Sequence, residues 1–174
     1  RSYRESRTPS SPSMLLELLS HQNFADMKYG LDPTFRFTVS RAIYKGMLKF
    51  LSFKEGIPYV VQPLPVKDFA AVLEQKDGKN SVRLSWTPVE DKLEPTAVAK
   101  RYVVYTRVNG SSFDNGVVVD NPYAVIPVES NKIYSFKVAA LNEGGASFPS
   151  EILSVGVAEG AGAKNATVMV VNGF

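Results

Sequence analysis

The spacing of apolar residues changes along the chain and divides it into parts of different predicted structure. Residues 1–53 hold an apolar run and then a stretch with helical spacing, whereas residues 66–158 hold short runs in which apolar and polar residues alternate. Helical spacing indicates a helix with one apolar face, and alternation indicates a strand with one buried face. We therefore predict a C-terminal fragment of an α/β domain at 1–53 and an all-β sandwich at 66–158.

A long helix is predicted to begin at Asp32-Pro33, because Asp is a favoured N-cap and Pro is favoured at the first helical position. The apolar and small residues that then recur at helical spacing are Phe35, Val39, Ala42, Ile43, Gly46, Met47, Phe50 and Leu51. This stripe needs another layer to cover it. Residues 1–32 supply at most one or two strands for such a layer, so we expect the earlier part of the domain to precede Arg1.

The stretch SPSMLLELLSHQN, residues 11–23, is predicted to contain a buried strand with Glu17 in its middle. A carboxylate in such a run is costly unless it is paired or has a function. Two interpretations follow for Glu17. It is a catalytic residue, or it forms a cap or salt bridge within its own domain, for example with one of the N-terminal arginines.

Residues 54–65, KEGIPYVVQPLP, contain three prolines and are predicted to be a semi-rigid linker. Four alternating runs then predict strands: SVRLSW at 81–86, RYVVYTRV at 101–108, YAVIPV at 123–128 and IYSFKVAAL at 133–141. Turn-forming sequences separate these runs, and six or seven short strands of this kind are typical of a sandwich. Residues 159–174 are predicted to be a hinge and the first strand, 166–171, of a truncated following domain.

Residues 66–158 contain Trp86 at the end of the second strand, Tyr102 and Tyr105 in the third, and a run from Tyr134 to Ser147 with an Asn-x-x-Gly turn. In these residues the segment resembles a fibronectin type III module. The resemblance implies structural roles for Trp86 and Tyr134, and it places Tyr134 at the tyrosine corner, where a buried ring bonds to an upstream backbone group. Independently of the resemblance, Trp86, Val104, Phe136 and Val138 alternate with polar residues and should fill the space between two sheets.

Four aromatic residues of the sandwich are candidates for a sugar-binding platform: Tyr102, Tyr105, Phe113 and Tyr123. They would form one only if their rings clustered on a single exposed face. The alternative is that most of them are core residues or cross-strand pairs. Ordinary strand composition favours this alternative, because Tyr and Phe are common in strands.

The segment from Pro12 to Leu51 is similar to the C-terminal end of zinc-dependent N-acetylmuramoyl-L-alanine amidases, which cut the bond between the glycan and the stem peptide of peptidoglycan. The similarity covers about residues 9–53 and rests on Pro12-Ser-Met-Leu-Leu-Glu17, Asn23, Asp26 and the closing helix. It implies that Glu17 lies beside the zinc and takes a proton from the metal-bound water. The family usually has Gly-Phe or Ser-Phe soon after the Glu, whereas this chain has Leu18-Leu-Ser-His21, which puts the specificity and activity of the parent protein in question.

A catalytic zinc needs about three protein ligands. In the amidases these are two His and a Glu, all upstream of the similar segment, whereas this chain contains one histidine, His21, and no cysteine. His21 is a candidate for a residue that contacts a zinc ligand or lines the substrate groove, or else it is a surface or capping residue. We therefore expect the chain by itself to bind zinc poorly and to hydrolyse nothing, and we expect zinc only in the parent.

Composition narrows the partners that the chain can have. Its residues are 44% hydrophobic, which suits soluble domains, and no apolar stretch reaches the roughly 20 residues that span a bilayer. Its 20 Lys and Arg are scattered, which is not the pattern of a nucleic-acid-binding surface. The resemblances imply peptidoglycan or another polysaccharide as the partner, and a secreted, periplasmic or cell-surface location; the oligomeric state stays open.

Two functions remain at this point. In the first, the sandwich is an accessory spacer or binding module of a modular secreted bacterial cell-wall hydrolase, behind an amidase-like catalytic domain. In the second, it is a carbohydrate-binding or structural module of a secreted polysaccharide-degrading, xanthan-lyase-like enzyme or of a surface-glycan protein. A fold alone does not decide between them.

Overall fold

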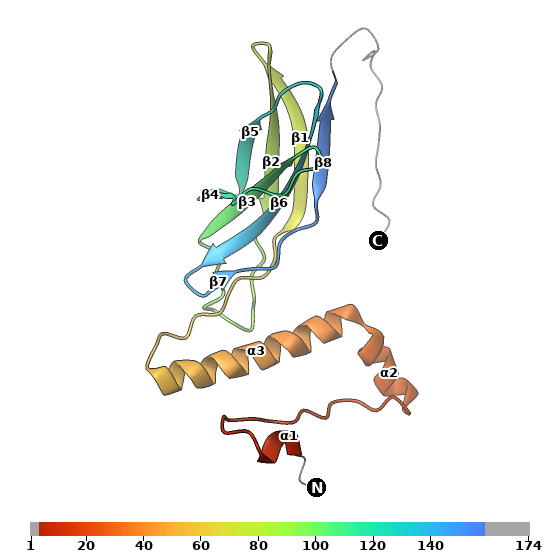
Figure 1. Ribbon diagram of the computed structural model, residues 1–174, viewed down its shortest axis with the longest axis vertical. Coiled ribbons are helices and arrows are strands. Elements are labelled where there is room, and N and C mark those ends of the chain that lie inside the picture. Colours follow the sequence, from red (N-terminus) through yellow and green to blue (C-terminus); the bar gives the residue numbers. More distant parts are fainter. Residues whose placement is uncertain (1–3, 159–174) are drawn as a thin grey trace. The chain divides into compact units, whose positions relative to one another are not determined.

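The computed structural model describes residues 4–158, which divide into two compact units between Ile57 and Pro58 (Figure 1). The first unit contains the helices α1 (Arg4–Arg7), α2 (Phe24–Leu31) and α3 (Pro33–Glu55). The second contains the strands β1 (Lys67–Lys76), β2 (Lys79–Thr87), β3 (Arg101–Val108), β4 (Val117–Val119), β5 (Tyr123–Pro127), β6 (Lys132–Asn142), β7 (Gly145–Ala146) and β8 (Leu153–Val157). Helices followed by a β-sandwich are the predicted fold class. The strand predicted at 166–171 lies outside the described residues.

Helix α3 begins where the sequence predicts. The Asp32 carboxylate accepts a hydrogen bond of 2.9 Å from the backbone N–H of Thr34, and Pro33 occupies the first turn. The helix ends at Gly56, which has a φ of 65° and so adopts the left-handed conformation that a glycine accepts without strain. Helix α2 starts in the same way, because the Asn23 side chain accepts from the N–H of Ala25.

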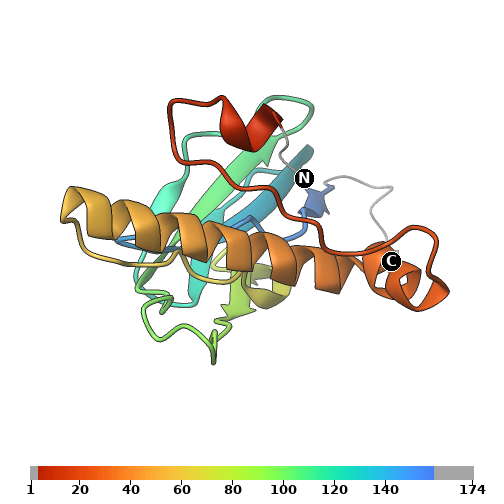
Figure 2. The same cartoon turned by 90° about the horizontal axis from the view of Figure 1, so that it is seen from below.

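Residues 12–20 run alongside α3 as an extended segment, but the predicted buried strand is not formed (Figures 1 and 2). The apolar side chains of this segment are open to solvent, and Met14 is 65% exposed. A strand needs a neighbouring strand to share its ladder of hydrogen bonds. The described part of the first unit contains only helices besides this segment, so no such neighbour is present there.

The second unit consists of two antiparallel sheets. One has the order β1-β2-β5, and the other has the order β4-β3-β6-β7, with β8 also paired to β6. In the second sheet Tyr105 lies opposite Lys137 and Thr106 lies opposite Phe136. Because successive side chains of a strand point to opposite faces, this register sends Phe136 toward the other sheet and Lys137 outward.

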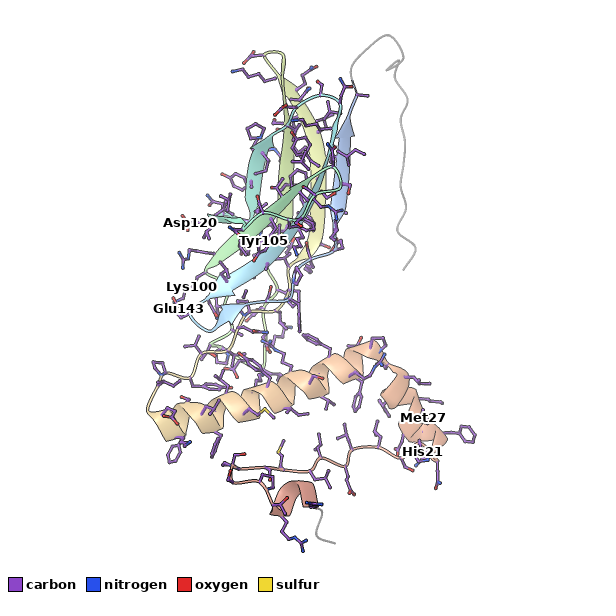
Figure 3. All side chains as sticks on the ribbon, viewed as in Figure 1. His21, Met27, Lys100, Tyr105, Asp120 and Glu143 are labelled. Carbon is purple, nitrogen blue, oxygen red and sulfur yellow. The ribbon has the colours of Figure 1, made fainter. Side chains whose placement is uncertain are left out.

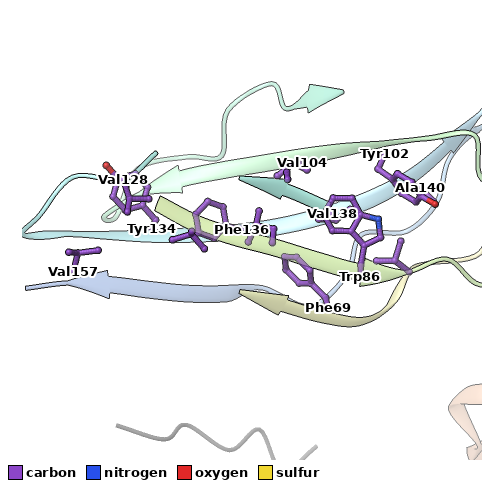
Figure 4. Packing of buried hydrophobic residues seen from close by; sticks show 14 residues of the cluster. Phe69, Trp86, Tyr102, Val104, Val128, Tyr134, Phe136, Val138, Ala140 and Val157 are labelled. Atoms are coloured by element: carbon purple, nitrogen blue, oxygen red, sulfur yellow. The ribbon is translucent and has the colours of Figure 1, made fainter. Parts of the chain in front are cut away.

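The core of the sandwich lies between the two sheets (Figure 4). The rings of Trp86 and Tyr102 meet edge to face, with their centroids 5.2 Å apart. The centroid of the Phe69 ring lies 6.4 Å from that of Trp86. Phe136 is fully buried. The buried apolar cluster is made of Val66, Phe69, Val82, Leu84, Trp86, Tyr102, Val104, Ala124, Val128, Tyr134, Phe136, Val138, Ala140 and Val157. It includes all four residues whose alternation predicted a core.

The segment before β1 is part of the sandwich unit. Val61 is fully buried, its N–H donates to the hydroxyl of Thr96, and its carbonyl accepts from the amide of Asn142. The hydroxyl of Tyr59 donates to the carboxylate of Glu94 at 2.9 Å. Residues 54–65 are predicted to be a semi-rigid linker, whereas side-chain hydrogen bonds and burial fix their second half to the sandwich.

Candidate functional site

An apolar groove of about 690 Å³ runs along the first unit. One wall is the extended segment, from which alternate residues face the groove, and the other wall is the apolar stripe of α3. The groove is lined by Pro12, Met14, Leu16, Leu18, Val39, Ala42, Ile43, Gly46, Met47 and Phe50. No titratable side chain is among them, so the groove offers an apolar surface and no catalytic group.

The first unit has no apolar core of its own among its described residues. Its one buried side chain there is that of Ser52, which is polar, whereas Phe24 and Phe53 are about nine-tenths exposed, at 90% and 89%. Helix α3 therefore carries apolar side chains that nothing in this unit covers. Isolated surface apolar residues are ordinary, but a contiguous apolar patch marks a surface that binds another structure.

Glu17 is exposed and does not line the groove, unlike its neighbours Leu16 and Leu18. In an extended chain successive side chains point in opposite directions, so Glu17 points away from the groove and from α3. His21 is exposed in the turn before α2 (Figure 3). Among residues 4–158 no three His, Cys, Asp or Glu side chains are grouped so as to hold a metal ion. The described residues therefore do not fit the zinc site of an amidase, and no ligand set for it can be drawn from them.

The four aromatic candidates of the sandwich do not gather on one face. Tyr102 is 4% exposed, points into the core and has its pKa raised by burial. Tyr105 lies three residues further along β3 and therefore faces outward, where Phe113 joins it. Tyr123 is 48% exposed on β5, in the other sheet. The structure thus brings together Tyr105 and Phe113 and separates Tyr102 and Tyr123 from them.

Two basic side chains complete the group around Tyr105 and Phe113. The Lys137 ammonium lies 5.1 Å from the centroid of the Tyr105 ring and 4.5 Å from that of Phe113, and the Arg107 guanidinium lies 5.0 Å from the Phe113 centroid. Arg107 and Lys137 are not among the site residues predicted from the sequence. The spacing of Tyr105 and Arg107 on one strand indicates a shared face, but the pairing with β6 that adds Lys137 is a long-range contact.

Trp86 and Tyr134, for which the sequence predicts structural roles, both belong to the buried cluster of the sandwich. Trp86 is 5% exposed between the sheets. The Tyr134 hydroxyl accepts a hydrogen bond of 3.1 Å from the backbone N–H of Glu129, five residues upstream. This is the contact that a tyrosine corner makes.

In the part of the chain that the structure describes, no helix is both long and apolar enough to cross a membrane.

Comparison with known proteins gives matches among solved structures alone. No family model matches the chain, and no curated protein matches it. The twitchin kinase region from C. elegans matches with 24% identity and a TM-score of 0.47, over 56% of this chain and 17% of that chain. The fourth fibronectin type III domain of a human protein matches with 19% identity and a TM-score of 0.46, over 60% and 87%. The FN5 domain of Drosophila Lar matches with 20% identity and a TM-score of 0.41, over 56% and 99%.

The strand order shows a β-sandwich of two antiparallel sheets in the second unit, and fibronectin type III domains are among the solved structures to which it is similar. The match spans less than a fifth of the twitchin chain, which contains other domains. The likeness is one of fold, and a fold of this kind hosts many functions.

Proposed function

We propose that the sandwich is an accessory module, a spacer or docking unit, in a modular secreted bacterial cell-wall hydrolase. In this proposal residues 1–53 are the C-terminal end of the amidase-like catalytic domain that precedes it. The parent protein acts on peptidoglycan at the cell surface or in the periplasm, and it holds a zinc ion through ligands outside the described residues.

One observation carries the proposal: the first unit exposes its apolar side chains instead of burying them. Its extended segment presents alternate apolar residues to α3, which is how a strand and a helix pack in one layer pair of an α/β domain. The remaining apolar residues of the segment, including Leu15 at 48% exposure, face away from the helix. We propose that the preceding part of the same protein supplies strands that pair with residues 12–19 and a further layer that covers these side chains.

Glu17 takes a definite place in this arrangement. It lies on the face of the extended segment opposite α3, so a sheet built onto the segment would carry Glu17 on the side away from that helix. There its carboxylate could accept a proton during hydrolysis of an amide. The similarity to the amidases is the reason for assigning it this role.

The alternative of a carbohydrate-binding module receives less support from the described residues. A stacking platform needs open aromatic faces. Tyr105 and Phe113 instead have the Lys137 ammonium over their rings, and Tyr102 is in the core. A spacer or docking role needs only a rigid sandwich with a fixed entry, which the contacts of Val61 provide.

The test uses the parent chain, extended upstream to a complete α/β domain, with purified peptidoglycan as substrate. Mass spectrometry of the soluble products should detect free stem peptides, and a zinc chelator should abolish their release. Glu17→Gln should lower turnover at least about a hundredfold while the zinc content stays unchanged. Glu55→Gln, which removes an exposed carboxylate at the end of α3, is the matched control and should keep full activity. Near-normal turnover of the Glu17 variant, or no stem peptide from a zinc-loaded protein, would refute the proposal.

A further inference from the structure

A pair of basic side chains lies on the outer face of the sheet that contains β3 and β6. Arg107 pairs across the strands with Ser135, and Tyr105 pairs with Lys137, so Arg107 and Lys137 are diagonal neighbours on one face. Both lie within 5.0 Å of the centroid of the Phe113 ring, which comes from the loop between β3 and β4. Both cations thus lie close to one aromatic ring.

The loop that supplies Phe113 is fixed to the sheet. The Asp114 carboxylate accepts hydrogen bonds from the backbone N–H of Thr106, at 2.9 Å, and of Gly116, at 3.0 Å. The N–H of Asp114 donates in return to the carbonyl of Thr106. Gly116 has a φ of 80°, and a Cβ there would lie 2.4 Å from the Val103 side chain. The backbone of the loop that carries the ring is therefore fixed to β3 before any ligand arrives.

The positive charge of the pair is not compensated by the described residues. Within residues 4–158 neither Arg107 nor Lys137 forms an ion pair with a carboxylate, and the nearby Asp114 is already engaged with backbone N–H groups. One terminal nitrogen of Arg107 donates to the Ser135 hydroxyl at 3.2 Å, while its Nε is buried without an acceptor. Two like charges near one ring repel each other, and both side chains are partly exposed to solvent.

We propose that Arg107 and Lys137 form a binding site for an oxyanion, the carboxylate or phosphate group of an acidic ligand. The planar guanidinium offers donors that match two oxygens of such a group, and the ammonium supplies a second charge. An oxyanion between them relieves their repulsion. The inference rests on the sandwich alone and stands whether or not the first unit belongs to an amidase.

The experiment is an NMR titration of the 174-residue chain labelled with ¹⁵N. Inorganic phosphate and D-galacturonate are the two probes, and both are added at constant ionic strength because salt screens exposed charges. The Nε–H resonance of Arg107 and the backbone amides of Phe113 and Lys137 should shift and saturate. Saturation with phosphate alone, with galacturonate alone or with both supports the site and identifies the anion that it takes.

Variants distinguish binding at this site from nonspecific attraction of anions to a positively charged protein. Lys137→Gln should weaken binding about fivefold, since it removes one charged hydrogen-bond donor at a partly exposed site, and Lys137→Arg should restore it. Arg83→Gln, on the other sheet, is the matched control and should leave the affinity unchanged. The absence of a saturating shift at Arg107 with both probes overturns the proposal, and this result needs no variant to fold. Wild-type affinity in Lys137→Gln would overturn it as well.

Discussion

The side-chain amide of Asn142 donates a hydrogen bond of 2.8 Å to the backbone carbonyl of Val61, 81 residues earlier in the chain. The same amide group donates to the carbonyl of Thr96 at 3.1 Å, and its oxygen accepts from the N–H of Gly144 at 2.8 Å. One side chain at the end of β6 thus joins the segment before β1 to the loop between β2 and β3. This contact sets the direction in which the chain enters the sandwich.

Asn142→Ala should therefore lower the free energy of unfolding of the sandwich by about 1–3 kcal/mol, because it leaves the partly buried carbonyls of Val61 and Thr96 without this donor. Urea unfolding followed by tryptophan fluorescence measures the change, since Trp86 is the one tryptophan and lies in the core. Asn121→Ala, at an exposed position, is the control and should change the stability by less than about 0.5 kcal/mol. Equal stability of the two variants would show that the Asn142 contact contributes nothing.

Gly144 allows the same segment to approach closely. A Cβ on this residue would lie 2.4 Å from the carbonyl oxygen of Val60, which is a backbone atom that cannot move aside by a rotamer change. Gly144→Ala should therefore destabilise the sandwich by about 1–3 kcal/mol through steric overlap. Gly110→Ala is the matched control, because a Cβ there meets nothing within 4 Å. Thermal unfolding of both variants checks the prediction, and a Gly144 variant as stable as the Gly110 variant would contradict it.

The tyrosine corner gives a third prediction. Tyr134→Phe keeps the buried ring but removes the acceptor of the Glu129 N–H, so the free energy of unfolding should fall by about 0.5–1.5 kcal/mol. Tyr123→Phe removes a hydroxyl from a ring that is 48% exposed and should have no measurable effect. Chemical denaturation of the two variants side by side is the measurement. A loss of the same size in both would argue against a special role for the corner.

The pH behaviour of Glu143 is the fourth prediction. Its hydrogen bond with the Lys100 ammonium, at 2.9 Å, lowers the pKa of its carboxyl below the ordinary value of 4.5 (Figure 3). A lowered pKa means that the contribution to stability is present above pH 4.5 and is lost as the pH falls through the folded-state pKa. An NMR titration of the Glu143 side-chain carboxyl carbon should show this low midpoint. Lys100→Gln should raise the midpoint toward 4.5, whereas Lys92→Gln should leave it unchanged.

The local features of the fold could be predicted from the sequence because short-range chemistry determines them. Asp32-Pro33 predicts the start of a helix, because Asp is a favoured N-cap and the φ of Pro is fixed near the helical value. The alternation around Val104, Phe136 and Val138 predicts strands with one buried face. The position of Tyr102 and Tyr105 on opposite faces of the sheet could also be predicted, since residues three apart on a strand point to opposite faces.

Other features depend on contacts between distant residues. The prolines around Val61 suggested a linker, and only the position of Asn142 in the folded sandwich shows that the segment is fixed. The cluster of Arg107, Phe113 and Lys137 requires both the register of β3 with β6 and the course of the loop that carries Phe113. The run at 14–19 has the apolar character of a buried strand, but a strand forms only where a partner strand is present.

The proposed function depends most on residues 1–53 being the end of a larger domain. Hydrogen exchange measured by mass spectrometry tests it, with the 174-residue chain compared against a chain extended upstream to a complete α/β domain. The account predicts fast exchange of residues 12–19 in the 174-residue chain and at least about hundredfold slower exchange in the extended chain, while β6 exchanges equally slowly in both. Exchange of residues 12–19 that is equally fast in the extended chain would contradict the account, and so would full protection of these residues in the 174-residue chain.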